Sequence, residues 1–390
     1  MNNLLISENL LKNYIFIIFL TLIFSETFLL DTSILYFCLI GFFLIINFER
    51  IKFTNFQLIS LSILIIYLIS SLILSENFFS VIINFKFYYG FLIFLLFLKL
   101  IKINQYLTKI LRTLLLISCI YTFFDAFIIN LFENINLHQE IHTAKYFNFY
   151  IRPPGIAGNS TISSLYILII FFILKKFYLI NFSKIEYFLI LSSVFLLFSA
   201  VGFITLFTIL FFLIYEPKKI NFYLNVIIYF LLILFLLLLS FIVDPDIAQK
   251  LSAKYMFYIL EEKIFFIKHI FLSQDLIYNK HSDLVYGDKF LDLTSEYRSC
   301  FNNYFGCQSA ISYPITSGDM GFFGFIIAMG YLGLFTFLLV FFAFLKQSRE
   351  NLFYSLFLIF VSFHYGLIFF NLGQFLFALI ISKNLRMKYQ

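Results

Sequence analysis

Residues 56–74, FQLISLSILIIYLISSLIL, carry no charged side chain and are long enough to cross a lipid bilayer as one helix. A spanning helix needs roughly 20 apolar residues, because lipid offers no hydrogen-bond partner to a bare backbone amide. Eleven further segments have the same character, so we predict about twelve spans. These eleven are residues 13–30, 33–48, 85–98, 113–130, 156–174, 186–199, 201–215, 221–243, 319–345, 351–363 and 366–382.

The basic residues between these segments predict the orientation of the chain. With the N-terminus placed in the cytoplasm, 17 of the 27 basic residues fall on the inner side, and seven of the ten outer ones lie within residues 244–318. Long segments follow the positive-inside bias only weakly, so the short loops decide, and both termini are expected to be cytoplasmic. The net charge of +6 then reflects membrane topology, and we expect no nucleic-acid partner.

The composition and the spacing of the apolar segments together predict the domain organisation. Hydrophobic residues make up 62% of the chain and charged residues 12%, which excludes a soluble domain and a disordered chain. We expect an all-α polytopic integral membrane protein. Residues 1–243 form nine spans with a short outer loop near 131–154, residues 244–318 form one large outer loop, and residues 319–390 form three more spans.

Two cysteines of the large outer loop, Cys300 and Cys307, are close enough in sequence to pair. In an oxidising compartment we expect a disulfide between them. Two reduced thiols are the alternative, and a zinc site is disfavoured because no histidine is adjacent. His138 and His142 have the spacing of metal ligands on a helix, but no third ligand is evident, so we predict no metal site.

Three short stretches carry the chemistry that the sequence suggests. Residues 152–160, RPPGIAGNS, lead from the first outer loop into the sixth span. Residues 199–202, SAVG, separate spans seven and eight. Residues 317–321, SGDMG, open the span after the large loop, and Gly324, Gly330 and Gly333 follow within it.

The order of these stretches, with a large outer loop late in the chain, resembles the order found in the superfamily of O-antigen polymerases and ligases. The resemblance is specifically to the Wzy-type polymerases. The resemblance covers nearly the whole chain in topology, but its motifs are short. It implies a metal-independent and cofactor-independent glycosyltransferase of the bacterial inner membrane, with the large loop in the periplasm. Such an enzyme joins oligosaccharide repeat units carried on undecaprenyl diphosphate, alongside a chain-length regulator and a flippase of the same pathway.

The resemblance also assigns roles to residues. Arg152 matches the family arginine at the end of the first outer loop, Arg298 corresponds by its place in the large loop, and Asp319 matches the aspartate of the family's Ser-Asp-x-Gly-like stretch. In one departure, Val201 and Gly202 replace the arginine that many relatives carry after the serine of the second stretch.

The residue types suit this chemistry by themselves. A guanidinium makes forked hydrogen bonds to phosphate oxygens, so Arg152 and Arg298 could hold the leaving diphosphate, with Lys280 and Lys289 as weaker candidates. Snorkelling to the interface is the alternative explanation of such cations.

The attacking sugar hydroxyl would be helped by a general base, for which the sequence offers Asp288, Asp292 and Asp319. Asp319 is the first residue of a predicted span. The alternative is therefore that its carboxylate stabilises the N-terminal end of that helix through the helix dipole. Asp125 and Lys86 lie in or near spans, where an ionisable group suggests function, but we expect both to reach water at the outer side.

Two other functions stay open. An O-antigen ligase transfers polymer to a lipid A-core acceptor, and ligases typically carry a histidine near the end of the large loop. Residues 308–317 contain none, which favours the polymerase. A flippase or transporter of lipid-linked sugars would show repeat symmetry and broken helices at the membrane midplane.

Overall fold

The computed structural model describes residues 8–27, 33–75, 78–100, 104–131, 145–146, 150–151, 153–214, 304–306, 321–345 and 367–382. This part of the chain is almost entirely helical. Its strands are β1 (Lys145–Tyr146) and β2 (Tyr150–Ile151), an antiparallel pair of two residues each. The expected all-helical class is therefore confirmed for the described residues, with this short pair as the departure.

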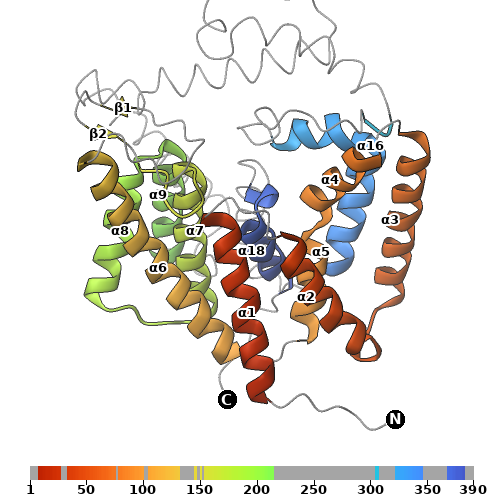
Figure 1. The fold of residues 1–390 in the computed structure, drawn as a ribbon, viewed down its shortest axis with the longest axis horizontal. Helices are drawn as coiled ribbons and strands as arrows, with labels where there is room; N and C mark the ends of the chain where they lie inside the picture. Colours follow the sequence, from red (N-terminus) through yellow and green to blue (C-terminus); the bar gives the residue numbers. More distant parts are fainter. Residues whose placement is uncertain are drawn as a thin grey trace, which may run out of the picture.

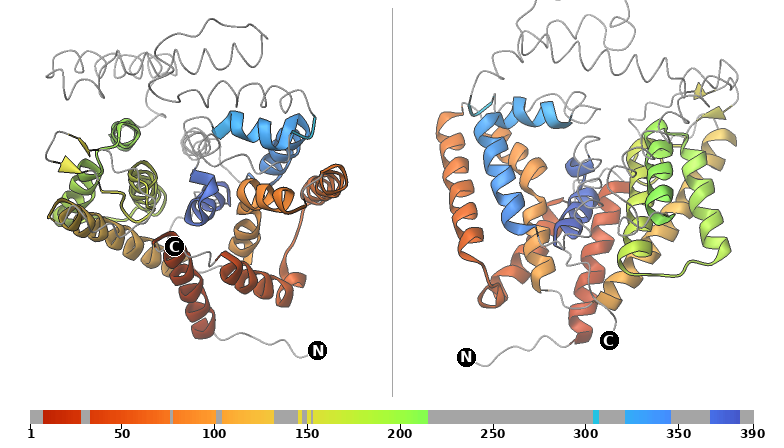
Figure 2. Two further views of the ribbon diagram at one scale, coloured as in Figure 1. Left: turned by 45° about the horizontal axis from the view of Figure 1, so that its top comes forward. Right: turned by 180° about the vertical axis from the view of Figure 1, so that it is seen from behind.

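The helices form two groups on either side of α1 (Glu8–Thr27) and α18 (Asn371–Ser382), as Figure 1 and Figure 2 show. One group contains α6 (Asn104–Leu131), α7 (Ser160–Phe172), the π-helical turn η2 (Ile173–Phe177), α8 (Lys184–Leu197) and α9 (Ala200–Ile214). The other contains α2 (Ser33–Ile46), the 3-10 turn η1 (Phe48–Arg50), α3 (Asn55–Leu74), α4 (Phe78–Tyr89), α5 (Phe91–Leu100) and α16 (Gly321–Phe344). A 3-10 turn, η3 (Leu367–Phe369), leads into α18.

By length and composition, three of the described helices could cross a membrane: Asn55–Leu74, Tyr106–Ile129 and Ser160–Phe177. A fourth arises if α4 and α5, which are bent by 48° relative to each other, form one span. These helices support the membrane character predicted from the sequence. The number of about twelve spans stays a prediction, and the predicted spans 221–243 and 351–363 lie outside the described residues.

Two of the predicted spans differ from the helices found in their place. The helical pair α4–α5 covers Phe78–Leu100 and breaks at Gly90, where the sequence suggested one span over residues 85–98. Helix α6 begins at Asn104, well before residue 113, and so includes Arg112. The Arg112 side chain is accommodated on the helix because it forms a two-pronged pair with Glu186, at 2.8 and 2.9 Å.

The helices of the α6–α9 group alternate in direction. At the end that is lower in Figure 1, Arg112 of α6 bonds Glu186 of α8, and Lys176 of η2 donates to the carbonyl of Phe212 in α9. We call this the lower end. At the opposite, upper end, the backbone N–H of Gly155 donates to Asp125 of α6. There too the hydroxyl of Ser199, directly before α9, donates to Thr161 in the first turn of α7. Successive helices of this group therefore run in opposite directions, as successive membrane spans do.

The α2–α5 group has a matching lower end. Lys99, in the last turn of α5, donates to Gln57 Oε1 near the start of α3 at 2.7 Å. Gln57 Nε2 in turn donates to the carbonyl of Ala343 near the end of α16 at 3.0 Å. The Lys99 ammonium also lies 4.7 Å from the ring centroid of Phe53. The lower ends of both groups thus carry cationic side chains with partners.

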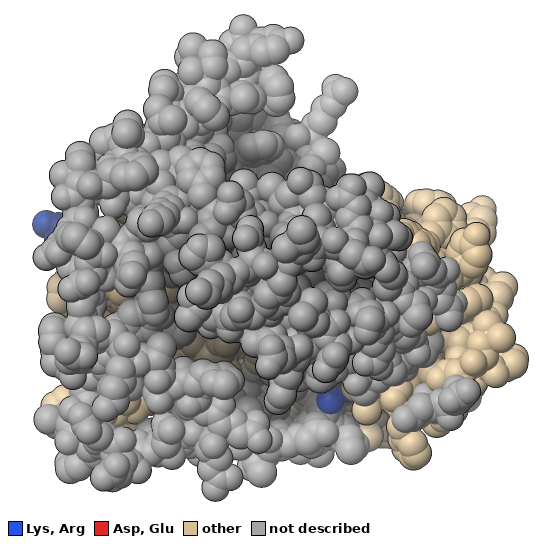
Figure 3. All heavy atoms as spheres, turned by 90° about the horizontal axis from the view of Figure 1, so that it is seen from above, with Lys and Arg blue, Asp and Glu red and all other residues tan. Residues whose placement is uncertain are grey.

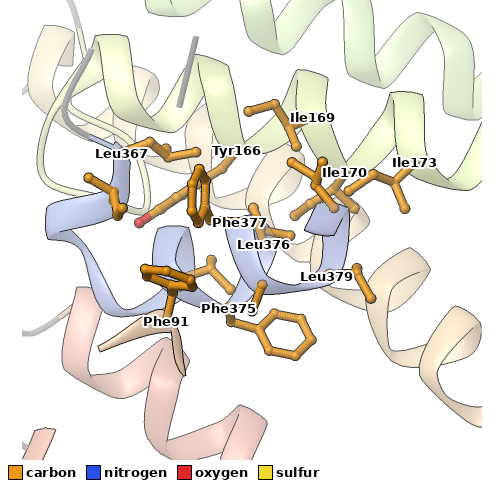
Figure 4. Close-up of a cluster of buried hydrophobic side chains, with 14 of the residues drawn as sticks. Phe91, Tyr166, Ile169, Ile170, Ile173, Leu367, Phe375, Leu376, Phe377 and Leu379 are labelled. Atoms are coloured by element: carbon orange, nitrogen blue, oxygen red, sulfur yellow. The ribbon is translucent and has the colours of Figure 1, made fainter. Parts of the chain in front are cut away.

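Helix α18 is the centre of the core. Its residues from Leu372 to Ile381 are all buried, so the helix is enclosed on every side. Figure 4 shows its Leu376 and Phe377 on the side of the isoleucines of α7, and its Phe375 on the opposite side. Phe91 and Phe377 meet edge to face with ring centroids 5.1 Å apart. The two helix groups are therefore joined through this one apolar helix.

Candidate functional site

Asp125 of α6 lies at the upper end of the α6–α9 group and is fully buried, with an exposure of 0%. Its Oδ2 accepts a hydrogen bond of 2.8 Å from the backbone N–H of Gly155. The expectation that Asp125 reaches water is wrong, because the turn after Pro154 folds over the carboxylate. Where described residues are visible from above in Figure 3, no acidic side chain is seen.

The turn from Pro153 to Asn159 owes its shape to two glycines. Gly155 and Gly158 have φ of +70° and +65°, a region that other residues enter only at a cost. The Gly158 N–H donates to the Gly155 carbonyl at 3.1 Å and closes the turn. A Cβ on Gly155 would lie 2.7 Å from Ser163 Cβ, so a side chain would not fit there.

Ser163 of α7 fixes the turn from the opposite side. Its hydroxyl donates to the carbonyl of Pro154 at 2.8 Å and accepts from the N–H of Ala157 at 3.0 Å. Asn159 caps the same helix, since its Oδ1 accepts from the N–H groups of Thr161 (2.9 Å) and Ile162 (3.3 Å). Asp125 and Ser163 together bind three polar backbone groups of the turn, and Asn159 binds two amides in the first turn of α7.

The second sequence stretch joins the first at this end. The Ser199 hydroxyl donates to Thr161 Oγ1 at 3.2 Å and accepts from the N–H of Gly202 at 3.2 Å. A Cβ on Gly202 would lie 2.6 Å from the Ser164 hydroxyl, so α9 approaches α7 as closely as a glycine allows. We call Asp125, Gly155, Thr161, Ser163 and Ser199, with the backbone they bind, the polar layer.

The glycines that follow the third stretch pack elsewhere. Helix α16 breaks at Gly330, whose φ is +67°, and packs mainly against α3 and α4. Freed backbone groups find partners there, since the Leu332 N–H donates to the Tyr304 carbonyl at 3.1 Å and the Tyr67 hydroxyl donates to the Met329 carbonyl at 2.5 Å. The Phe305 ring stacks on Tyr67 with centroids 5.8 Å apart. The described residues therefore place the second stretch against Thr161, directly after the first stretch, and place Gly330 and Gly333 in the other helix group; residues 317–320 lie outside the described residues.

A further buried polar residue holds the break between α4 and α5. Gln374 of α18, which is 0% exposed, donates from Nε2 to the carbonyls of Lys86 (2.8 Å) and Phe87 (3.2 Å) in the last turn of α4. Carbonyls at the end of a helix depend on such donors from outside the helix, and here Gln374 adds to the bond that Lys86 already accepts from the Gly90 N–H at 3.1 Å. A Cβ on Gly90 would lie 2.9 Å from Gln374 Cδ, so the glycine makes room for the amide.

The side chains expected to carry the chemistry lie outside the described residues. They are Arg152, Arg298, Lys280 and Lys289 as substrate ligands, Asp288, Asp292 and Asp319 as bases, and the pair Cys300 and Cys307. Their roles stay predictions. The described chain resumes at Pro153, the residue after Arg152.

The sequence reasoning missed the polar partners of the turn. The signal was present, because Ser160, Thr161, Ser163 and Ser164 form a run of small hydroxyl residues directly after a glycine turn. Chemically, the polar layer offers hydroxyls, backbone amides and one carboxylate, whose Oδ1 has no hydrogen-bond partner among the described residues. Such a carboxylate oxygen can accept from an N–H or O–H group.

Function must be argued from this arrangement alone. Comparison of the chain with models of protein families, with curated proteins and with solved structures found no match.

Proposed function

We propose that this protein is a polysaccharide polymerase of the bacterial inner membrane, a glycosyltransferase that joins repeat units carried on undecaprenyl diphosphate. The observation that supports it most is that Ser199 of the second stretch bonds Thr161, which directly follows the first stretch, at the upper end of one helix group. In this proposal the upper end faces the periplasm, and the N- and C-termini are cytoplasmic.

The distribution of cations along the described helices agrees with this orientation. Arg112, Lys176 and Lys99 lie at the lower ends of their groups, and each has a partner there. The polar layer lies at the other end and, among the described residues, contains no basic side chain. A lipid diphosphate arriving at the upper end would need a cation from the flanking residues, and Arg152 directly precedes the turn.

In the proposed reaction a hydroxyl of the acceptor sugar attacks the anomeric carbon of the donor. The bond from that carbon to the diphosphate oxygen breaks, and undecaprenyl diphosphate leaves. Arg152 and Arg298 stabilise its negative charge, and one of Asp288, Asp292 and Asp319 takes the proton of the attacking hydroxyl. Chain-length regulators and the flippase of the same pathway are the partners that such an enzyme would meet.

Deletion of the gene in its host and electrophoresis of extracted lipopolysaccharide test the proposal. Loss of the ladder with a single repeat unit left on the core supports a polymerase. Loss of every repeat with accumulation of lipid-linked polymer would support the ligase instead. Complementation with Arg152→Ala should fail at normal protein level. Lys145→Ala removes another cation of the same outer loop and serves as the matched control, for which we expect a normal ladder.

A second function has structural support, namely movement of a lipid-linked sugar across the membrane. Two broken helices lie side by side, α4–α5 with its bend of 48° and α16 with its break at Gly330. Tyr88 and Phe325 join them edge to face at 4.6 Å. Discontinuous helices of this kind are typical of transporter binding sites. Reconstitution in vesicles with a fluorescent lipid-linked oligosaccharide separates the two functions, since transport without elongation would favour this second one.

A further inference from the structure

We infer that the segment Tyr304–Gly306 is a latch, which holds α16 folded back at Gly330 and whose release lets α16 become one continuous helix. The inference concerns a change of shape and does not depend on the proposed function. In Figure 1 the first part of α16 runs across the upper end of its helix group, and the second part turns down from it. The latch touches α16 where these two parts meet.

Two aromatic rings of α16 show how far the helix is folded back. The ring centroids of Phe325 and Phe337 lie 5.2 Å apart. In a continuous helix the same two residues would be about 18 Å apart along the axis. The rings meet because Gly330, with φ of +67° and ψ of −176°, departs from helical values and turns the chain. The distance between these two positions therefore reports whether α16 is folded back.

The latch reaches α16 through its backbone. The Leu332 N–H donates to the Tyr304 carbonyl at 3.1 Å, and a Cβ on Gly330 would clash with that carbonyl oxygen. Gly306 also has a φ of +67°, so a glycine on each side permits the close approach. In a continuous helix the Leu332 N–H would instead donate to the carbonyl of Ala328, four residues earlier. One amide thus has two alternative acceptors, one for each shape of the helix.

A carbonyl at the break also depends on a partner outside α16. A continuous helix would pair the Met329 carbonyl with the Gly333 N–H, but here it accepts from the Tyr67 hydroxyl at 2.5 Å. The Phe305 ring of the latch stacks on the same Tyr67, with ring centroids 5.8 Å apart and an angle of 2° between the planes. Lipid offers no hydrogen bond to an unpaired backbone group. Release of the latch therefore favours the continuous helix, which pairs these groups within α16.

A continuous α16 would be a different element in the membrane. Its 24 residues would extend about 36 Å, enough to cross a hydrocarbon core of about 30 Å, whereas residues 331–344 alone extend about 21 Å. The change would also separate Phe325 from Tyr88, whose rings now meet edge to face at 4.6 Å. Tyr88 lies just before the break of α4–α5 at Gly90. The latch therefore acts on both broken helices.

The experiment uses tryptophan fluorescence of the purified full-length protein in lipid nanodiscs. The chain contains no tryptophan, so Phe325→Trp provides a single emitter. Leu338→Cys, at an exposed position next to Phe337, carries a nitroxide quencher. Quenching is measured as the difference between labelled proteins with and without Leu338→Cys, which removes any contribution from the native cysteines. Because nitroxides quench only over a short range, we expect strong quenching while α16 is folded back.

Two variants weaken the latch and its seat on α3. Phe305→Ala removes the stack on Tyr67, and Tyr67→Phe keeps that ring but removes the donor to the Met329 carbonyl. Each should lower the quenching at least about twofold, because straightening moves the emitter to a place about 18 Å farther along the helix. Phe177→Ala is the matched control. It removes a partly buried ring that meets Phe172 in the other helix group at 5.6 Å, and should leave the quenching unchanged.

The thermal midpoint of each variant shows whether it is folded. Lower quenching in Phe305→Ala and Tyr67→Phe, with the control unchanged, is the result we expect. Full quenching in a folded Phe305→Ala would overturn the inference, because α16 would then stay folded back without the latch. Should Phe305→Ala not fold, Tyr67→Phe decides in the same way. Weak quenching before any latch substitution would also overturn it, since the two parts of α16 would not lie together.

Discussion

Replacing Gly330 by alanine tests whether the break in α16 is held by the segment Tyr304–Gly306. Alanine at a φ of +67° costs about 1–3 kcal/mol in backbone strain. Its Cβ would lie 2.5 Å from the carbonyl carbon of Tyr304, a backbone atom that cannot rotate away. The segment must therefore move, which gives up the bond from Leu332 N–H, about 1 kcal/mol, and the Phe305–Tyr67 stack, about 0.5–1.5 kcal/mol. We expect a total loss of about 3–5 kcal/mol in the free energy of unfolding.

The assay is reversible unfolding in mixed micelles by titration with a denaturing detergent, followed by circular dichroism. Gly41→Ala is the control, because a Cβ on Gly41 meets nothing within 4 Å and should raise stability by about 0.5–1 kcal/mol, as alanine does in a helix. Phe305→Ala removes the stack alone and should fall between the two. Equal stability of Gly330→Ala and Gly41→Ala would refute the argument.

Three further outcomes are expected. Arg112→Lys replaces a two-pronged pair with Glu186 by a single contact and should lower unfolding free energy by about 1 kcal/mol, because the pair is partly exposed; the same titration checks it. Gln374→Leu takes a donor from two buried carbonyls of α4 and should cost about 1–3 kcal/mol of unfolding free energy; a loss below about 0.5 kcal/mol, the scatter of surface substitutions, would contradict it. Cys300 and Cys307 should resist alkylation in intact cells until a reductant is added, and ready labelling without it would exclude the disulfide.

The sequence predicted helices well where apolar character and length coincide. Residues 56–74 became α3, which differs by a single residue at its start. The prediction failed at α4–α5, because a hydropathy pattern does not report the bend at Gly90, where Gln374 contributes an amide from far along the chain. It also placed the start of α6 too late, since Arg112 looked like a loop residue and has its partner Glu186 on another helix.

The candidate site was predictable only in its backbone. Glycines in residues 152–160 leave the backbone free for conformations that other residues avoid, and both Gly155 and Gly158 have a positive φ. The partner of the turn was not predictable, because Asp125 precedes it by 30 residues and an isolated aspartate near a span end is equally compatible with solvent. Contacts between distant segments depend on packing, which a single sequence does not display.

The enclosure of α18 has a consequence for how the protein is made. This helix, Asn371–Ser382, follows the other described helices in the sequence, yet it lies between them and contacts both groups. Synthesis on the ribosome runs from the N-terminus, so α1 to α9 are made before residues 371–382, their central packing partner. We expect the facing surfaces of α5 and α7 to stay uncovered during that interval, and a chain that terminates before residue 371 to leave the two groups without the helix that joins them.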